Sequence, residues 1–204
     1  MQVASDVAAV VRPGCCVVDG VTVVMRDARQ DAPLRRAAEA MRTATESAEV
    51  TAAVRTMYKR VGIDPTKTRP SSEALLRRVR RGEDLPRINS LVDIINWCSL
   101  ESQLPFGLYD LDRLAGDVTC RLGQPGEEYA GIRKDVVHVA GRLTLADNVG
   151  PFGNPTSDSA RTMVTAATTR ALVVIFAPVS VAPPIVDHVL ALTRQRIAEY
   201  CQAS

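Results

Sequence analysis

Two carboxylates and one amide stand where they could hydrolyse a small polar substrate: Glu127, Asp158 and Asn96. Glu127 follows Gly126 just after a predicted strand, where a carboxylate can bind an ammonium group or orient a water molecule. Asp158 ends the segment Asp147–Asp158, which is rich in turn-forming residues, and long loops without regular structure are frequently functional. An ordinary solvated turn would explain Glu127 equally well, so the residues alone leave both interpretations open.

A polar stripe runs along one face of a predicted helix. Asn89, Asp93 and Asn96 follow one another at steps of four and three, so they share that face. They form either an exposed surface or one wall of a pocket beside Tyr109 and Asp110, because loops that follow helices often build sites.

Four arginines form the clearest basic patch: Arg77, Arg78, Arg80 and Arg81. They lie in the last turn of a predicted helix, where they can simply be a solvated face that complements the helix dipole. The functional alternative is a contact to RNA phosphates. Aromatic residues make up only 4% of the chain, so broad stacking on single strands is not indicated.

Several common kinds of site are not indicated. The segment Gly123–Glu127 has two glycines but lacks the lysine and spacing of a phosphate-binding loop. His138 and His188 have no partners at ligand spacing, and Ser159 and Thr162 lack a nucleophile-elbow pattern. We therefore expect no metal and no cofactor.

Composition indicates one globular domain. The chain has 204 residues, 46% of them hydrophobic, and a net charge of +2, less basic than is usual for a duplex-binding protein. We expect no DNA partner and a monomer. The longest apolar run, Ala171–Pro178, is too short to cross a membrane, and no leader-like pattern opens the chain. With five cysteines and no CxxC spacing, we expect free thiols and a cytoplasmic protein.

The pattern of apolar residues predicts both helices and strands. Thr43 and Glu46 have the spacing of a capping box that starts a new helix, and Gly62 stops it. Predicted strands cover Val17–Met25, Val118–Leu122, Leu143–Ala146, Arg170–Ala177 and a segment near His138. Predicted helices cover Leu34–Met41, Thr43–Val61, a segment from Ser71 or Ser72 to Arg81, Ile88–Cys98, and a terminal segment from Pro183.

Several longer motifs together resemble one known family. They include YKRVGIDPTKTRPSSEALLRRVRRG, LPRINSLVDIINWCSL, LPFGLYDLDRL, the Gly126–Glu127 pair, and LTLAD followed by NPTSDSARTMVTAATTRALVVIF, from about Tyr58 to Phe176. The chain resembles a free-standing B3/B4 domain, the tRNA-editing domain built into the β subunit of phenylalanyl-tRNA synthetase. One departure stands out, because Gly107 and Leu108 replace the histidine-alanine pair of the synthetase motif.

The resemblance implies an α+β fold, a single layered domain of mixed β-sheet with packed helices. That domain would span residues 1–204, with its core at about 58–176, an N-terminal strand and helices in 1–57, and a C-terminal helix at 183–201. It also implies a metal-free hydrolytic pocket for the aminoacyl end of a misacylated tRNA. The expected function is therefore a trans-editing aminoacyl-tRNA deacylase.

Roles can be assigned within that hypothesis. Catalysis would fall to Glu127, Asp158 and Gly153, with the backbone N–H groups of Gly150 and Gly153 stabilising the oxyanion. The substrate-binding residues would be Asn96, Tyr109, Asp110, Asn154 and Thr168. The tRNA-binding residues would be Arg77, Arg78, Arg80 and Arg81.

The substrate and even the activity stay open at this level. The amino acid could be a near-cognate one, or a non-protein analogue such as canavanine on an arginine tRNA, since Glu127, Asp158 and Asp110 would suit a cationic side chain. The alternatives are a non-catalytic module that binds tRNA or an amino acid, and an enzyme acting on another small ester or amide.

Overall fold

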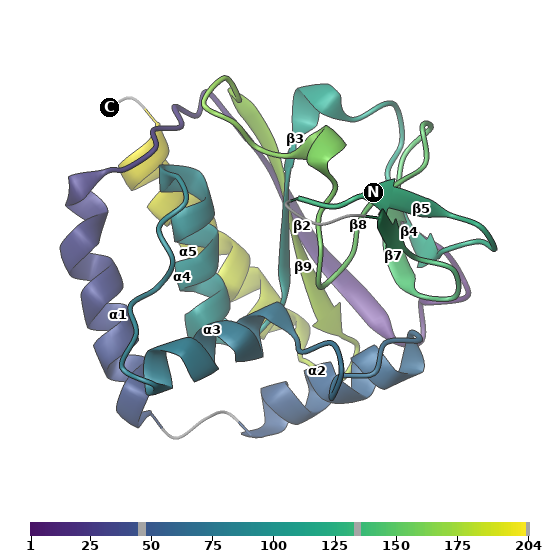
Figure 1. Ribbon diagram of the computed structural model, residues 1–204, viewed down its shortest axis with the longest axis horizontal. Helices are drawn as coiled ribbons and strands as arrows, with labels where there is room; N and C mark the ends of the chain where they lie inside the picture. The colour runs from purple at the N-terminus through teal and green to yellow at the C-terminus, as the bar shows by residue number, and fades with distance from the viewer. Residues whose placement is uncertain (45–47, 133–135, 203–204) are drawn as a thin grey trace.

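Helices gather on one side of the molecule and strands on the other in the computed structural model, which describes residues 1–44, 48–132 and 136–202 (Figure 1). The predicted α+β class is confirmed. The helices are α1 (Asp31–Thr43), α2 (Ala48–Arg60), α3 (Ser71–Arg80), α4 (Ser90–Ser102) and α5 (Pro183–Cys201). The strands are β1 (Gln2–Val3), β2 (Val11–Asp19), β3 (Phe106–Asp110), β4 (Thr119–Leu122), β5 (Glu128–Ala130), β6 (Val136–His138), β7 (Leu143–Ala146), β8 (Pro151–Gly153) and β9 (Arg170–Pro178).

A three-stranded antiparallel sheet in the order β2-β9-β3 forms the centre of the molecule. Every residue of β9 after Arg170 is buried, as its unbroken apolar run predicts for a strand covered on both faces. Helix α5 packs closely on β2 at Gly14, where an added Cβ would lie 2.5 Å from Val186 Cγ1. Glycine is therefore required there by space rather than by backbone conformation.

The smaller strands form a second layer on the right of Figure 1. One sheet has the order β1-β4-β7-β8, with β1 parallel to β4 and the other pairs antiparallel. Strands β5 and β6 form a separate hairpin. The long loop of the sequence, Asp147–Asp158, thus contains a short strand, β8, and then continues as the irregular segment 154–158.

Helices α1, α3, α4 and α5 pack on one another to the left of the central sheet, while α2 packs against β9 (Figure 1). Asn89 caps α4, because its side chain accepts a hydrogen bond of 2.9 Å from the Val92 backbone N–H. Helix α3 begins at Ser71, one of the two predicted starts, with Pro70 in the cap position and no side-chain cap hydrogen bond.

Two local predictions need correction. The strand expected at Val17–Met25 is confirmed only at Val17–Asp19, the end of β2, because Gly20 then turns the chain with a φ of 66°. Thr43 is the last residue of α1 and not the cap of a new helix, and its expected partner Glu46 lies outside the described residues. Within the described ranges, no helix has the length and apolar character needed to span a bilayer.

Candidate functional site

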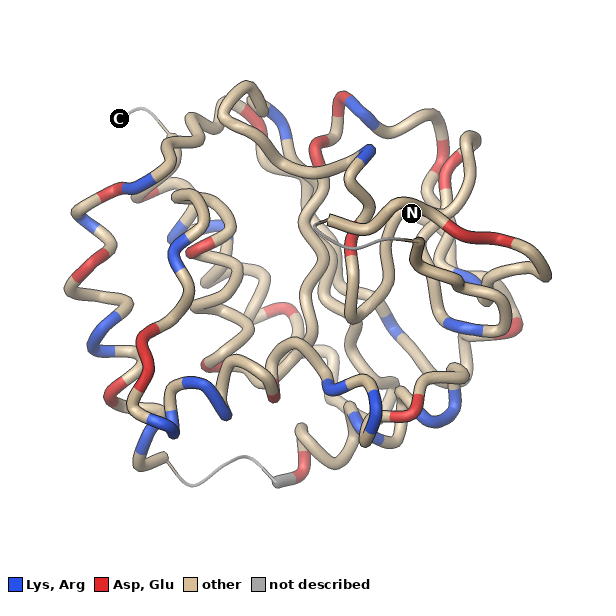
Figure 2. The backbone as a smooth tube through the Cα atoms, in the orientation of Figure 1, with Lys and Arg blue, Asp and Glu red and all other residues tan. Residues whose placement is uncertain are grey.

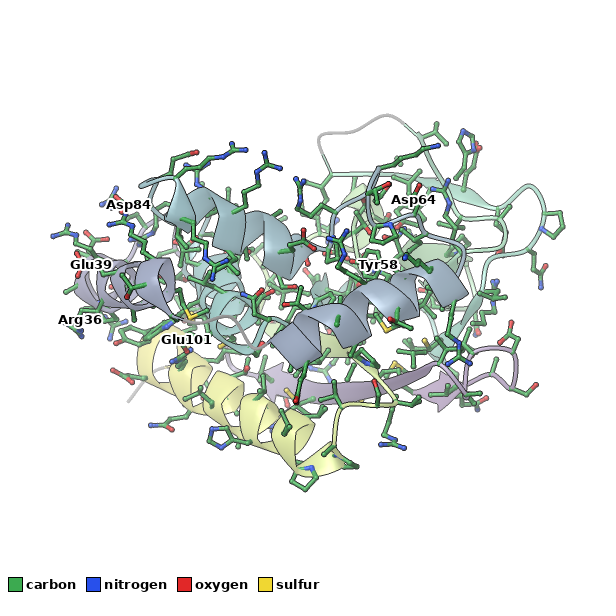
Figure 3. All side chains as sticks on the ribbon, turned by 90° about the horizontal axis from the view of Figure 1, so that it is seen from below. Arg36, Glu39, Tyr58, Asp64, Asp84 and Glu101 are labelled. Carbon is green, nitrogen blue, oxygen red and sulfur yellow. The ribbon has the colours of Figure 1, made fainter. Side chains whose placement is uncertain are left out.

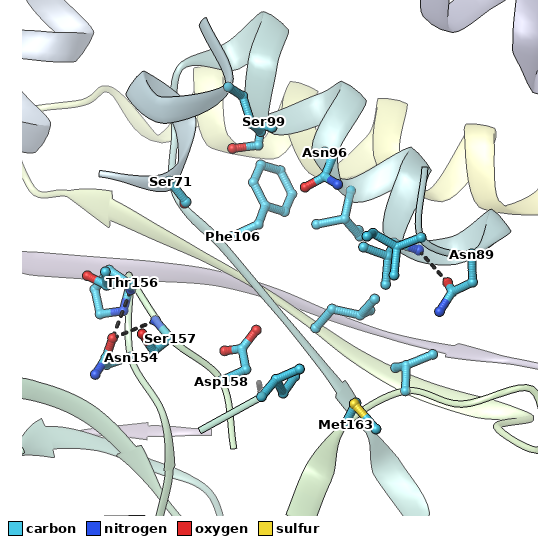
Figure 4. Close-up of a pocket in the computed structure, with 18 residues that line it drawn as sticks. Ser71, Asn89, Asn96, Ser99, Phe106, Asn154, Thr156, Ser157, Asp158 and Met163 are labelled. Carbon is cyan, nitrogen blue, oxygen red and sulfur yellow. Dashed lines mark hydrogen bonds between the residues drawn. The ribbon is translucent and has the colours of Figure 1, made fainter. Parts of the chain in front are cut away.

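A cavity of about 330 Å³ lies between the helices and the central sheet (Figure 4). Its walls come from α3, α4, β3 and the segment 154–158, and most of the lining is apolar. The residues that line it are Ser71, Leu75, Ile88, Asn89, Val92, Ile95, Asn96, Ser99, Phe106, Leu108, Ile132, Asn154, Pro155, Thr156, Ser157, Asp158, Met163 and Val164. Segments between Ser71 and Val164 therefore come together around one space.

Asp158 is the single acidic residue of this lining, and its carboxyl group points into the cavity (Figure 4). Its Oδ1 atom is buried without a hydrogen-bond partner within the described residues. Burial raises the pKa of Asp158 to about 7, although the neighbouring Tyr109 hydroxyl and the Leu108 backbone lower it in part. Asp158 therefore exchanges a proton near neutral pH, as a general acid or base requires.

Tyr109 lies behind Asp158 and does not line the cavity. It is fully buried, and its ring packs edge-on against Phe152 at 4.8 Å. Its hydroxyl forms no hydrogen bond with the described residues but lies close enough to Asp158 for each group to shift the pKa of the other. Gly107 and Gly153 make room for it, since an added Cβ would lie 2.2 Å and 2.3 Å from the Tyr109 hydroxyl oxygen. The predicted substrate contact of Tyr109 is thus replaced by a contact with the carboxyl group.

Asn96 faces Asp158 from the α4 wall of the cavity (Figure 4). No hydrogen bond of its side chain is formed with any residue that the structure describes, so its amide is available to a ligand. Asn89 also lines the cavity, but its oxygen caps α4. Asp93 is bound instead by Arg87 at 2.6 Å, so the predicted polar stripe divides between the cavity and a structural ion pair.

Three side chains hold the segment 154–158 that carries Asp158. Asn154 lines the cavity as predicted, and its Oδ1 accepts hydrogen bonds from the backbone of Thr156 and Ser157 at 2.8 and 2.9 Å. Tyr58 of α2 (Figure 3) donates to the Pro155 carbonyl at 2.8 Å. Tyr129 of β5 donates to the Ser157 carbonyl at 2.5 Å, so the segment is anchored from both sides.

Glu127 does not line the cavity, and the prediction that it shares one space with Asn96 and Asp158 is wrong. Both of its carboxylate oxygens accept hydrogen bonds of 2.7 Å from Arg121, and one also accepts from the Gln124 backbone. The bonds from Arg121 hold the pKa of Glu127 below its usual value. Glu127 is thus an ionised partner in a local ion pair on the strand layer.

Other predicted site residues are also engaged elsewhere. Asp110 accepts a hydrogen bond of 2.7 Å from the buried Thr168 hydroxyl, and neither residue lines the cavity. The Gly150 N–H donates to Asp147, and Gly153 gives space to Tyr109 rather than reaching the cavity. The expected oxyanion donors therefore do not face this site.

Arginines in and just after α3 line a second, more open hollow of about 560 Å³ beside the cavity. Figure 2 shows basic residues gathered along α3. Arg77, Arg78 and Arg81 belong to this hollow, whereas Arg80 donates to the Ala44 carbonyl, at the end of α1. The predicted patch of four arginines is thus divided.

Sequence reasoning missed several residues of the two hollows. Phe106 and Leu108 lie on the cavity face of β3, and Ser71 and Ser99 project from two helices. Arg69 precedes α3 and lines the second hollow. Alternation along β3 could have placed Phe106 and Leu108 on one face, but it cannot tell a cavity wall from a packed core. In the described part of the chain, no cluster of three or more acidic, cysteine or histidine side chains is arranged to hold a metal ion.

The comparisons with known proteins agree on one family. A model of the B3/4 domain matches residues 53–189. The phenylalanine–tRNA ligase beta subunit of Ralstonia nicotianae is 34% identical over 76 residues, covering 37% of this chain and 8% of the relative. That of Fusobacterium nucleatum is 34% identical over 87 residues, covering 42% and 11%. The chain thus spans about a tenth of the length of these curated relatives.

Among solved structures, an N-terminal fragment of the phenylalanyl-tRNA synthetase beta subunit from Pyrococcus horikoshii is similar at low identity, with a TM-score of 0.45 and 16% identity. The match covers 55% of this chain and 41% of that chain.

Proposed function

This chain belongs to the B3/4 domain family, and from that membership we propose that it hydrolyses, in trans, the ester of a mischarged tRNA. The observation that carries the proposal is the cavity, whose volume of about 330 Å³ falls at the small end of the ligand-site range of about 300 to 1,000 Å³. It is enclosed enough to hold an amino acid side chain and contains one carboxyl group with a pKa of about 7.

Asp158 acts as the general base in this proposal. Its carboxylate accepts a proton from a water molecule while the water oxygen adds to the ester carbonyl carbon. The proton then passes to the ribose oxygen as the ester C–O bond breaks, which leaves a free amino acid and a deacylated tRNA. Asn96, across the cavity, donates a hydrogen bond that orients the bound acyl group.

The residues that line the cavity also indicate which kind of amino acid side chain the site would accept. Of the three carboxylates expected to favour a cationic side chain, only Asp158 lines the cavity. The other walls are mainly aliphatic and aromatic, which favours a largely apolar side chain with one polar group over canavanine. A site of this kind rejects a side chain that leaves its buried polar group unmatched.

A panel of mischarged tRNAs, including canavanyl-tRNA(Arg), tests the proposal by loss of the ester over time. We expect at least one member to be deacylated by the purified protein and not by the Asp158→Asn variant. Glu127→Gln is the matched control, because it changes a carboxylate outside the cavity and should retain activity. Tight binding with an unchanged ester half-life would instead identify a non-catalytic module.

A further inference from the structure

The second hollow is lined by positively charged side chains, whereas the lining of the cavity contains none. Its lining contains four arginines and one acidic residue, Glu83. Arg78 is paired with Glu83 at 2.9 Å, and Arg69 with Glu73 at 3.3 Å. Arg77 and Arg81 are exposed, and their side chains form no ion pair or hydrogen bond with residues that the structure describes. Two unpaired guanidinium groups therefore face the hollow, one helical turn apart.

The hollow and the cavity are joined. Four residues line both spaces: Ser71, Leu75, Asn96 and Thr156. Asn96 has an unengaged amide and stands at the junction. A ligand that fills the cavity with one end can therefore extend directly into the arginine-lined hollow with the other.

We propose that this hollow binds the phosphate group of the nucleotide that carries the amino acid, one ribose ring from the ester held in the cavity. The inference rests on the proposed function and specifies how its substrate is recognised. Arg77 and Arg81 supply planar donors that suit phosphate oxygens, and such charge-assisted bonds are stronger than neutral ones. Recognition is then concentrated on the last nucleotide of the tRNA.

Three substrates with the same amino acid separate the phosphate contact from the chemistry. The first is the amino acid esterified to the ribose of adenosine, which has no phosphate. The second is the same ester of adenosine 5′-monophosphate, and the third is the whole tRNA. Arg77→Glu and Arg81→Glu are measured on each, with KM and kcat determined separately.

We expect each charge reversal to raise KM by at least about tenfold on the two phosphate-bearing substrates, the loss typical of one charge-assisted hydrogen bond. On the adenosine ester both should stay within about twofold of the wild-type KM, since no phosphate is present to lose that bond. Arg80→Glu is the control, because it places the same charge change near the same helix end but outside the hollow.

Equal effects on all three substrates, no effect on any, or a matching effect of Arg80→Glu would overturn the phosphate site. An effect seen with the tRNA but not with the mononucleotide ester would also overturn it, because the contact would then lie farther along the RNA. Failure of the proposed function looks different, since the wild-type protein would leave all three esters intact.

Discussion

At the scale of single residues, the site depends on the carboxyl group of Asp158, whose burial costs folding free energy when it is ionised. Asp158 has no basic partner in the cavity lining, so burial raises its pKa to about 7 without an ion pair to offset it. Buried groups with shifted pKa values in enclosed cavities are candidates for catalysis. The Tyr109 hydroxyl beside it opposes part of the shift.

The raised pKa of Asp158 predicts a specific dependence of stability on pH. The folded protein binds this proton more tightly than the unfolded chain, so folding stability falls as pH rises from about 4 to about 7. The loss contributed by this group is at most roughly 4 kcal/mol. Asp158→Asn should remove it, so urea denaturation should show the variant gaining stability relative to wild type between pH 5 and pH 8. A constant difference across that range would contradict the assignment.

Tyr109 and the two glycines around it give a second prediction. Gly153→Ala should destabilise the protein by about 1 to 3 kcal/mol, because the new Cβ overlaps the Tyr109 ring and hydroxyl. Tyr109→Phe removes the hydroxyl oxygen, so the double variant should recover part of the loss. Thermal or urea unfolding of both single variants and the double variant measures this coupling, and strictly additive losses would refute the contact.

The residues of the site were only partly predictable. Asn96, Asn154 and Asp158 were found because polar residues on a helix face and in a long loop are visible in the sequence. Glu127 resembled them in type and setting, and only the structure shows that Arg121 engages it. The spacing of Arg121 and Glu127 in the sequence does not predict their ion pair, because both residues would also fit an exposed turn.

At the scale of elements, the site depends on the irregular segment 154–158, which is held in place by hydrogen bonds from α2 and β5. Tyr58 from α2 and Tyr129 from β5 each donate a hydrogen bond to a carbonyl of the segment 154–158. The helices and the long buried strand β9 followed from apolar periodicity and turn residues. The hydrogen bonds from Tyr58 and Tyr129 could not be predicted in the same way, because both tyrosines bond to backbone atoms, which every residue possesses.

Tyr58→Phe should loosen this segment. The change leaves the carbonyl of the buried residue Pro155 without its donor, which costs about 1 to 3 kcal/mol of stability. Because Asp158 follows three residues later, kcat should fall by about tenfold or more through misplacement of the base. Tyr200→Phe, which removes a hydroxyl on α5 far along the chain from this segment, is the control for both measurements, and equal effects would exclude a special role for Tyr58.

At the scale of the whole molecule, attraction to RNA must be local, because the net charge is only +2. The two unpaired arginines at the second hollow share one phosphate in the proposed site. For a single-stranded end the slope of log KM against log salt is then about 0.7, the value for one neutralised phosphate. Deacylation rates over a range of potassium chloride concentrations measure it, and a slope several times larger would indicate a much wider RNA interface.

The pH dependence of kcat/KM on a mischarged tRNA that the protein hydrolyses, in wild type and Asp158→Asn, tests the central claim most directly. We expect the wild-type value to rise with pH and level off above about 7, because the base must lose its proton to act. The variant should be slower by about a hundredfold or more at the plateau. A variant that keeps the wild-type rate and profile would show that ester hydrolysis does not take place at this carboxyl group.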